Sequence, residues 1–201
     1  MIDYELVKYD SKIGYYSYYI SGNGRDDSIY RADSVFKSKL LYYTSHVPST
    51  LTQPFDSLKK SGVAIATSVD GLFRIYNWDN ETGGTMRFYD NVFQYKNEGK
   101  VTSGILPYCY SPEDDDPGCG YSDTIYMVKT NNKIYYIAIY YVIASSRVSA
   151  KGVRFFTVDN GKMNDTVHLI RTKTGLTSHI EYEIDNNLRG SDKPGGDGNI
   201  L

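Results

Sequence analysis

The chain has 201 residues and a formal net charge of -2, and it contains 21 tyrosines against 7 phenylalanines and 1 tryptophan. A chain of this length suits one domain with a substantial core, and two small domains are the alternative. The 22 basic residues nearly balance the 24 acidic ones without forming a cluster, which argues against a nucleic-acid partner, and no apolar run reaches the ~20 residues of a membrane span.

The abundance of tyrosine favours a β-rich protein. Tyrosine suits half-buried sheet faces, because its ring packs against neighbours while its hydroxyl reaches water or a partner. It is also enriched in protein–protein interfaces. We therefore expect amphipathic sheet faces, one of which can serve as a tyrosine-lined recognition surface.

The first 60 residues are expected to begin with strands and continue with helices. Residues 1–20 hold two tyrosine-rich stretches, YELVKY and IGYYSYYI, around a turn at DSK, and are predicted to form a hairpin. Apolar residues then repeat at helical spacing, which predicts a helix over about 28–45 that stops before Pro48. A shorter helix is expected over PFDSLKK, residues 54–60.

From residue 63 onward the pattern predicts strands. In chain order the segments read VAIATS, LFRIYNW, TMRFYDNVFQYK, KVTSGIL, DTIYMVKT, KIYYIAIYYVIA, GVRFFTV, TVHLIRT and HIEYEI. Turn signals such as Asn-Glu-Gly and Asp-Asn-Gly-Lys separate them, which predicts an antiparallel meander. The segment from Ile134 to Ile143 is apolar on both faces. We expect it at the sheet centre, covered by the helix on one side and by a second sheet or loops on the other.

These elements predict an α+β, mainly β fold. Residues 1–188 are expected to form a single domain with a large antiparallel meander sheet, open-barrel or sandwich-like, and one or two N-terminal helices. A propeller-like array is the alternative, but a complete propeller needs at least four blades of roughly 40 residues. Residues 189–201 have the Gly, Pro and Asp content of a flexible C-terminal tail.

Two cysteines lie in one acidic loop. Cys109 and Cys119 enclose the nine residues YSPEDDDPG, which is compatible with a loop-closing disulfide and an oxidising compartment. Two free thiols in a reducing cytosol are the alternative. The acidic residues of the loop are Glu113, Asp114, Asp115 and Asp116. We expect a solvated loop, with a weak cation site or a charged docking loop as alternatives.

The opening residues, MIDYELVKYD, do not form a signal-peptide pattern. That fits a cytoplasmic protein, and it fits equally a mature exported protein given a new initiator methionine. The expected disulfide favours a periplasmic or secreted location.

Catalytic and cofactor motifs are not found in the sequence. It has no G-x-S-x-G elbow, no metal-ligand spacing and no phosphate-binding glycine loop. His46, His168 and His179 lack a diagnostic neighbourhood, and His168 in TVHLI is expected to be a strand residue. We therefore predict no cofactor and no metal centre.

The stretch IYNWDNETGGTMRFYD, residues 75–90, holds the only tryptophan. NETGG is predicted to be a turn whose Gly-Gly pair permits positive φ. Strand periodicity places Arg74, Tyr76 and Trp78 on one face. The candidate binding residues of this region are Arg74, Tyr76, Trp78, Asp79 and Arg87. A hairpin whose tryptophan caps an edge of the core is the alternative.

The segment IATSVDGLFRIYNWDNETGGTMRFYDNVFQYK, with LTQPFDSLKKSG upstream and NNKIYYIAIYYVIASS downstream, resembles a group of small exported bacterial proteins of unknown function. That group shares a DG…RIYSWD…GGTM…QY-like core. The resemblance spans about residues 50–145, and Asn77 stands where the shared core has Ser. It implies an exported, β-rich protein without a known catalytic constellation, and it transfers no functional residue.

Our leading hypothesis is a non-enzymatic binding protein of the bacterial envelope. It would engage another protein through a tyrosine-rich sheet face or the acidic loop, for example as an inhibitor or immunity protein against a secreted toxin with a basic surface. The alternative is a carbohydrate-binding or glycan-hydrolysing protein that uses Trp78 with Asp79 and Glu81. A structural envelope component is a third option.

Overall fold

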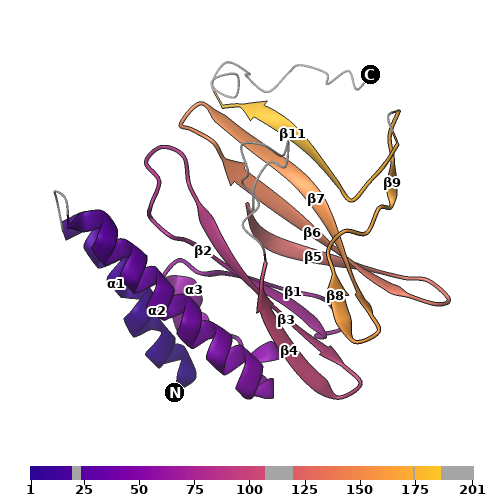
Figure 1. Ribbon diagram of the computed structural model, residues 1–201, viewed down its shortest axis with the longest axis horizontal. Coiled ribbons are helices and arrows are strands. Elements are labelled where there is room, and N and C mark those ends of the chain that lie inside the picture. The colour runs from indigo at the N-terminus through magenta and orange to yellow at the C-terminus, as the bar shows by residue number, and fades with distance from the viewer. Residues whose placement is uncertain (20–23, 107–119, 174, 187–201) are drawn as a thin grey trace.

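The computed structural model describes residues 1–19, 24–106, 120–173 and 175–186. The fold is α+β and mainly β, as the sequence predicts, and its strands pair antiparallel with their neighbours. A helical layer, a four-stranded sheet and a five-stranded sheet follow one another across the molecule (Figure 1). Neither of these two sheets closes into a barrel.

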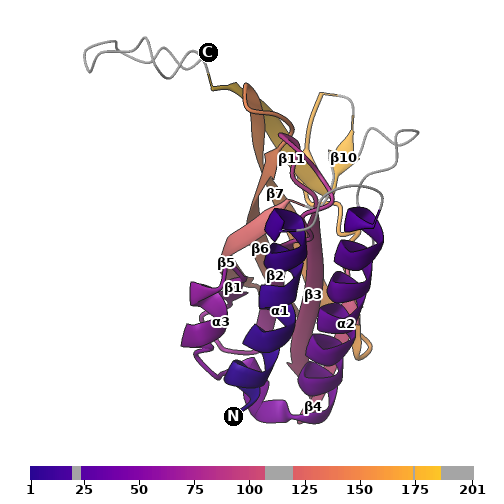
Figure 2. The ribbon, with the colours of Figure 1, turned by 90° about the vertical axis from the view of Figure 1, so that its left-hand side faces the viewer.

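The helical layer covers one face of the four-stranded sheet. Its elements are α1 (Ile2–Tyr19), α2 (Arg25–His46), the 3-10 helix η1 (Pro48–Leu51) and α3 (Asp56–Lys60). Figure 2 shows α1 and α2 side by side in front of β2 and β3. The prediction of a helix over 28–45 is confirmed, and so is that of a short helix after Pro54.

The predicted hairpin over residues 1–20 is wrong, because Ile2–Tyr19 form α1. Leu6, Asp10 and Ile13 recur at helical spacing and are buried on one side of it. Their burial outweighs the strand preference of the surrounding tyrosines. Asp3 on α1 also accepts hydrogen bonds from the backbone N–H groups of Ser57 (3.0 Å) and Leu58 (2.8 Å). It therefore pairs N–H groups of the first turn of α3 that have no acceptor within that helix.

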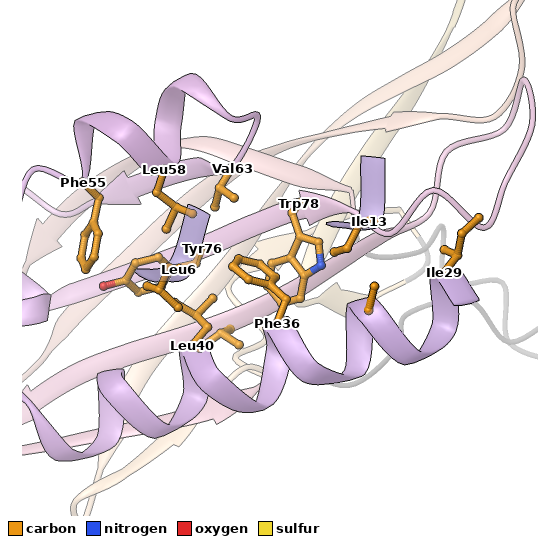
Figure 3. Close-up of a cluster of buried hydrophobic side chains, with 12 residues drawn as sticks. Leu6, Ile13, Ile29, Phe36, Leu40, Phe55, Leu58, Val63, Tyr76 and Trp78 are labelled. Atoms are coloured by element: carbon orange, nitrogen blue, oxygen red, sulfur yellow. The ribbon is translucent and has the colours of Figure 1, made fainter. Parts of the chain in front are cut away.

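The four-stranded sheet is buried on both sides. Its strands, in spatial order, are β1 (Ala64–Thr67), β2 (Phe73–Asp79), β3 (Tyr89–Asn97) and β4 (Lys100–Ile105). On the helical side, Trp78 packs edge-on against Phe36 with ring centroids 4.9 Å apart, in a cluster that also holds Ile13 and Tyr76 (Figure 3). On the other side, Phe73 stacks on Tyr136 of the second sheet at 4.9 Å.

The five-stranded sheet packs its inner face on the first sheet. Its strands are β5 (Tyr121–Lys129), β6 (Ile134–Ile143), β7 (Val148–Asp159), β8 (Lys162–Asn164) and β11 (His179–Asp185), and β9 (Ile170–Arg171) pairs with β10 (Leu176–Thr177) separately. β6 is an interior strand of this sheet, as expected, but no described helix covers it. β2 is buried on both faces along almost its whole length.

The predicted strand TVHLIRT is only partly correct. Its described structure contains the two-residue strand β9, and His168 is exposed outside it. Asn164 accepts hydrogen bonds from the backbone N–H and the hydroxyl of Thr166, both at 3.0 Å. This local turn competes with strand pairing and ends β8.

Some sequence predictions lie outside the described residues. They concern the Cys109–Cys119 pair, the acidic residues Glu113, Asp114, Asp115 and Asp116, and the tail over 189–201. Within the part of the chain that the structure describes, no helix has both the length and the apolar character needed to cross a bilayer.

The packing of α1 gives a test that separates a helix from the predicted hairpin. Positions 4 and 6 would share one face of a strand, but in α1 Leu6 is fully buried while Tyr4 is 70% exposed. We expect Leu6→Ala to lower the free energy of unfolding by about 2–5 kcal/mol, because it leaves a cavity. Tyr4→Ala should change it by less than about 0.5 kcal/mol. Equal losses in urea denaturation would contradict this packing.

Candidate functional site

Arg74 and Tyr76 lie on the helical side of β2, and both are buried. The Arg74 guanidinium donates to the carbonyl oxygens of Thr50 and Gln53, each at 2.7 Å, and to Thr67 Oγ1 at 2.8 Å. The Tyr76 hydroxyl is 2.9 Å from the same Thr50 oxygen. These bonds fix the segment around η1 to the sheet, which gives both residues a structural role.

Trp78 closes a buried charged network between α2 and the first sheet. It is 2% exposed, and its Nε1 donates to Asp33 Oδ1 at 2.7 Å. Lys37 Nζ lies 3.1 Å from Asp33 Oδ2 and 3.0 Å from Asp90 Oδ2. Burial, and then the nearby Asp90 carboxylate, raise the pKa of Asp33 to about 6. The network holds α2 on the first sheet. Because Trp78 is buried, a ligand cannot stack on its indole ring.

Asp79 and Arg87 form an ion pair at the C-terminal end of β2. Arg87 Nη1 lies 2.9 Å from Asp79 Oδ2 and 3.4 Å from Glu81 Oε2. With Asp10, the two carboxylates line a pocket of about 130 Å³ beside Trp78. Pockets for drug-sized ligands have volumes of roughly 300–1,000 Å³, so this pocket is small for an oligosaccharide.

Burial raises the pKa of Asp79, and it raises that of Asp10 to about 6. These carboxyl groups therefore hold their protons more tightly than exposed ones. Among the described residues, no group of three or more His, Cys, Asp and Glu side chains is arranged to hold a metal ion.

The NETGG segment forms a turn, but not through positive φ at its glycines. The residue with positive φ is Glu81, at 59°. Its backbone N–H donates to Asp79 Oδ1 at 2.8 Å, and the Thr82 N–H donates to Asn80 Oδ1 at 3.1 Å. A Cβ at Gly83 would lie 2.1 Å from the Met86 carbonyl oxygen, so glycine is needed there for close approach.

A second candidate surface lies on the face of the five-stranded sheet that points away from the first sheet. None of the residues singled out in the sequence belongs to it. Because strand residues alternate between faces, the neighbours of the inward-packed Tyr136, Ala138 and Phe156 point away from the core. We call this surface the outer tyrosine face. Its residues are Tyr121, Thr124, Tyr126, Val128, Tyr135, Ile137, Ile139, Tyr141, Lys151, Val153, Phe155, Ile180 and Tyr182.

These side chains form rows that cross the sheet. Tyr121, Tyr141, Lys151 and Tyr182 are in register on β5, β6, β7 and β11. Tyr121 and Tyr141 stack with ring centroids 5.3 Å apart, and Lys151 Nζ lies 5.0 Å from the Tyr141 centroid. A hydrogen bond to Tyr141 raises the pKa of Lys151. Tyr121 also packs on Tyr89 of β3, with ring centroids 5.1 Å apart, so the β5 end of the row contacts the first sheet. The row is an ordered aromatic strip with one cation beside it.

The outer tyrosine face is partly exposed and carries little charge. Tyr126 is 58% and Tyr182 56% exposed, whereas most of its other residues are half-buried. Lys151 is the one charged residue in the rows, and the exposed Asp123 lies beside them. Four strands at about 4.8 Å spacing and about nine residues at 3.3 Å make a face of roughly 15–20 by 30 Å. The largest apolar patch on a monomeric protein typically covers about 300–600 Å² and is often functional. Such a face is typical of an interaction site.

The sequence of β6 contains a signal for this face, although its pattern predicts a strand that is covered on both sides. The run IYYIAIYYVIA is apolar at both alternating sets of positions, which predicts a strand covered on both sides. In the structure one set packs inward and the other, with Tyr135 and Tyr141, is only half-buried. The apolar outer set is therefore the sequence signal of the exposed face.

Comparisons of the chain with protein-family models, with curated protein sequences and with solved structures found no match. The arrangement of the described residues is therefore the basis for assigning a function.

The buried carboxyl of Asp10 predicts a pH-dependent stability. Its folded-state pKa of about 6 exceeds the ordinary 3.8, so its stabilising contribution is full below that ordinary pKa and is lost as the pH rises through 6. We expect Asp10→Asn to be more stable than the wild type at pH 7.5, by roughly 1–3 kcal/mol, and the gap to narrow at pH 5.

Urea denaturation at both pH values measures this gap. The wild type and Asp10→Asn differ only at position 10. Both keep Ser61, which hydrogen-bonds Asp10 in the wild type, and the neighbouring carboxylates of Asp79 and Glu81. The exposed Asp56 is a control, and Asp56→Asn should give no gain at pH 7.5. A gap for Asp10→Asn that is equal at the two pH values would refute the assignment.

Proposed function

We propose that the protein is a non-enzymatic binding protein that docks onto another protein through its outer tyrosine face. The observation that carries the proposal is the row of Tyr121, Tyr141, Lys151 and Tyr182, with apolar rows beside it. Tyr182 is exposed, and the other three residues are half-buried. Interface cores are enriched in tyrosine and depleted of charge, and this composition matches both properties.

The sheet makes the face a rigid platform. Tyrosine gives a large contact area with few rotatable bonds, so little conformational entropy is lost when a partner covers it. Stacking and the Lys151–Tyr141 contact order the row before binding. A partner would therefore meet a surface that needs little rearrangement.

Exposed tyrosines on the helices form a less suitable surface. Tyr4, Tyr18, Tyr30 and Tyr42 are exposed along α1 and α2. Charged side chains alternate with them along both helices, including Lys8, Lys12, Arg31 and Lys39. A solvated helix surface has this mixed composition, whereas the rows of the outer tyrosine face hold Lys151 as their one charged residue, with Asp123 beside them.

The partner should present an apolar surface with acceptors for the tyrosine hydroxyls and a carboxylate opposite Lys151. In its specific form, the proposal is an inhibitor or immunity protein of the bacterial envelope that occludes a secreted toxin. The expected export and the resemblance to small exported proteins support this form. Residues Glu113–Asp116 would then meet a basic part of the toxin.

A carbohydrate site at Trp78 is not supported by its surroundings. Carbohydrate stacking needs an accessible ring, and Trp78 is 2% exposed. Asp79 and Glu81 face a pocket of about 130 Å³, and Arg87 pairs with both of them.

The outer face can be tested with matched pairs of tyrosines. Tyr126→Glu/Tyr182→Glu places two charges on the outer tyrosine face, and Tyr30→Glu/Tyr42→Glu changes helical tyrosines that are 60% and 56% exposed. Protein captured by the wild type from the native host should be identified and purified. We expect the first variant to weaken its binding at least roughly 30-fold, as loss of a central interface residue does, and the second to leave it unchanged.

Calorimetric titration gives the dissociation constants, and circular dichroism checks that both variants fold. Binding that survives the outer-face variant and is lost in the helical one would contradict the proposal. If the captured protein is a second copy of this chain, analytical ultracentrifugation of the same variants shows whether the face is a dimer interface instead.

A further inference from the structure

A second feature lies at the end of the molecule where three hairpin turns meet. These turns join β3 to β4, β5 to β6 and β7 to β8, and they converge at one end of the two sheets (Figure 1). Between them is a hollow of about 700 Å³. That volume matches the roughly 300–1,000 Å³ of small-molecule pockets, but the hollow is widely open to solvent and its lining is mostly polar.

The wall of the hollow is rich in amides and ammonium groups. Its polar lining residues are Lys96, Asn97, Lys129, Thr130, Asn131, Asn132, Lys133, Asp159 and Asn160. Four apolar residues, Leu72, Ile134, Tyr136 and Val158, complete the lining. None of these residues belongs to the outer tyrosine face, although Lys133 Nζ lies 5.8 Å from the ring centroid of Tyr135 on that face.

The charge balance of the hollow is positive. Asp159 is the single carboxylate in its lining, and Lys133 Nζ lies 2.6 Å from Asp159 Oδ1. Hydrogen bonding to Lys133 holds the pKa of Asp159 below its usual value. Lys96 and Lys129 form no ion pair with the residues that the structure describes. Two ammonium groups therefore remain available for an anion.

The turn that carries Asn131 and Asn132 is ordered by its own hydrogen bonds. Thr130 Oγ1 donates to the Lys133 carbonyl oxygen at 3.0 Å and accepts from the Lys133 N–H at 3.1 Å. The turn bonds therefore use Thr130 and the backbone. Each asparagine amide offers donors and an acceptor, which is the combination that a ligand hydroxyl requires.

We propose that this hollow binds a polyhydroxylated anion of saccharide size, such as a sulfated oligosaccharide. Lys96 and Lys129 would pair with its anionic groups, and the asparagine amides would bond its hydroxyls. A single inorganic anion would fill only a small part of about 700 Å³. The ligand therefore needs both the charge and the hydroxyl-bearing rings.

A sulfated tetrasaccharide titrated calorimetrically at low salt is the test. We expect the wild type to bind it, with affinity that falls as salt rises. Lys96→Gln/Lys129→Gln should weaken binding at least tenfold. The control variant, Lys59→Gln/Lys60→Gln, removes the same charge from exposed lysines at the end of α3 and should leave binding unchanged.

Two outcomes would overturn the proposal. The first is equal weakening by both lysine pairs, which would mean that only net charge attracts the saccharide. The second is inorganic sulfate displacing the tetrasaccharide at equal sulfate-group concentration, which would mean that the rings add nothing. Retention of partner binding by Lys96→Gln/Lys129→Gln would separate this site from the protein interface.

Discussion

The burial of β2 on both faces is the constraint on which the rest of the structure depends. Tyr76 and Trp78 pack under the helices, while Phe73 and Ile75 pack against the second sheet. Every polar group on such a strand needs a partner. Asn77 illustrates this, because its side chain accepts from the Ser122 N–H at 3.0 Å and donates to the Ser122 carbonyl oxygen at 2.8 Å, joining the two sheets.

The same constraint explains where the free surface lies. Both described long helices are used to cover the first sheet, and the first sheet in turn covers the inner face of the second. The outer face of the second sheet is then left at the surface, although its residues are as apolar as a buried face. The Trp78 region, which drew attention in the sequence, is part of the interior. The exposed tyrosines of β5 and β11 are the groups that a partner can reach.

Local patterns predicted much of the fold. The spacing of Ile29, Phe36 and Leu40 predicts the long helix, and glycine- and asparagine-containing turns separate most of the strands correctly. The short strands β8 and β10 are not predicted by the sequence pattern. Residues 1–20 were assigned to strands because tyrosine has a strand preference, although Leu6 and Ile13 already had helical spacing. Strand preference is a weak guide when the tertiary structure buries one side of a helix.

The candidate site was harder to predict, because it depends on which strands share a sheet. An apolar pattern on both faces of β6 does not say whether the second face meets a helix or solvent. Likewise, the lysines and asparagines of the hollow come from three separate segments of the chain, which meet only where the hairpin turns converge. Arg74 can be buried because its guanidinium donates hydrogen bonds to the carbonyl oxygens of Thr50 and Gln53. These contacts join distant parts of the chain, so the local sequence pattern does not predict them.

The most direct test of the central claim is side-chain footprinting of tyrosines, read by mass spectrometry with and without the bound protein partner. Exposed tyrosines on both sides of the molecule serve as internal probes. If the outer tyrosine face is the interface, Tyr126 and Tyr182 lose reactivity on binding while Tyr4, Tyr30 and Tyr42 keep theirs. Protection of the helical tyrosines with Tyr126 and Tyr182 unchanged would contradict it.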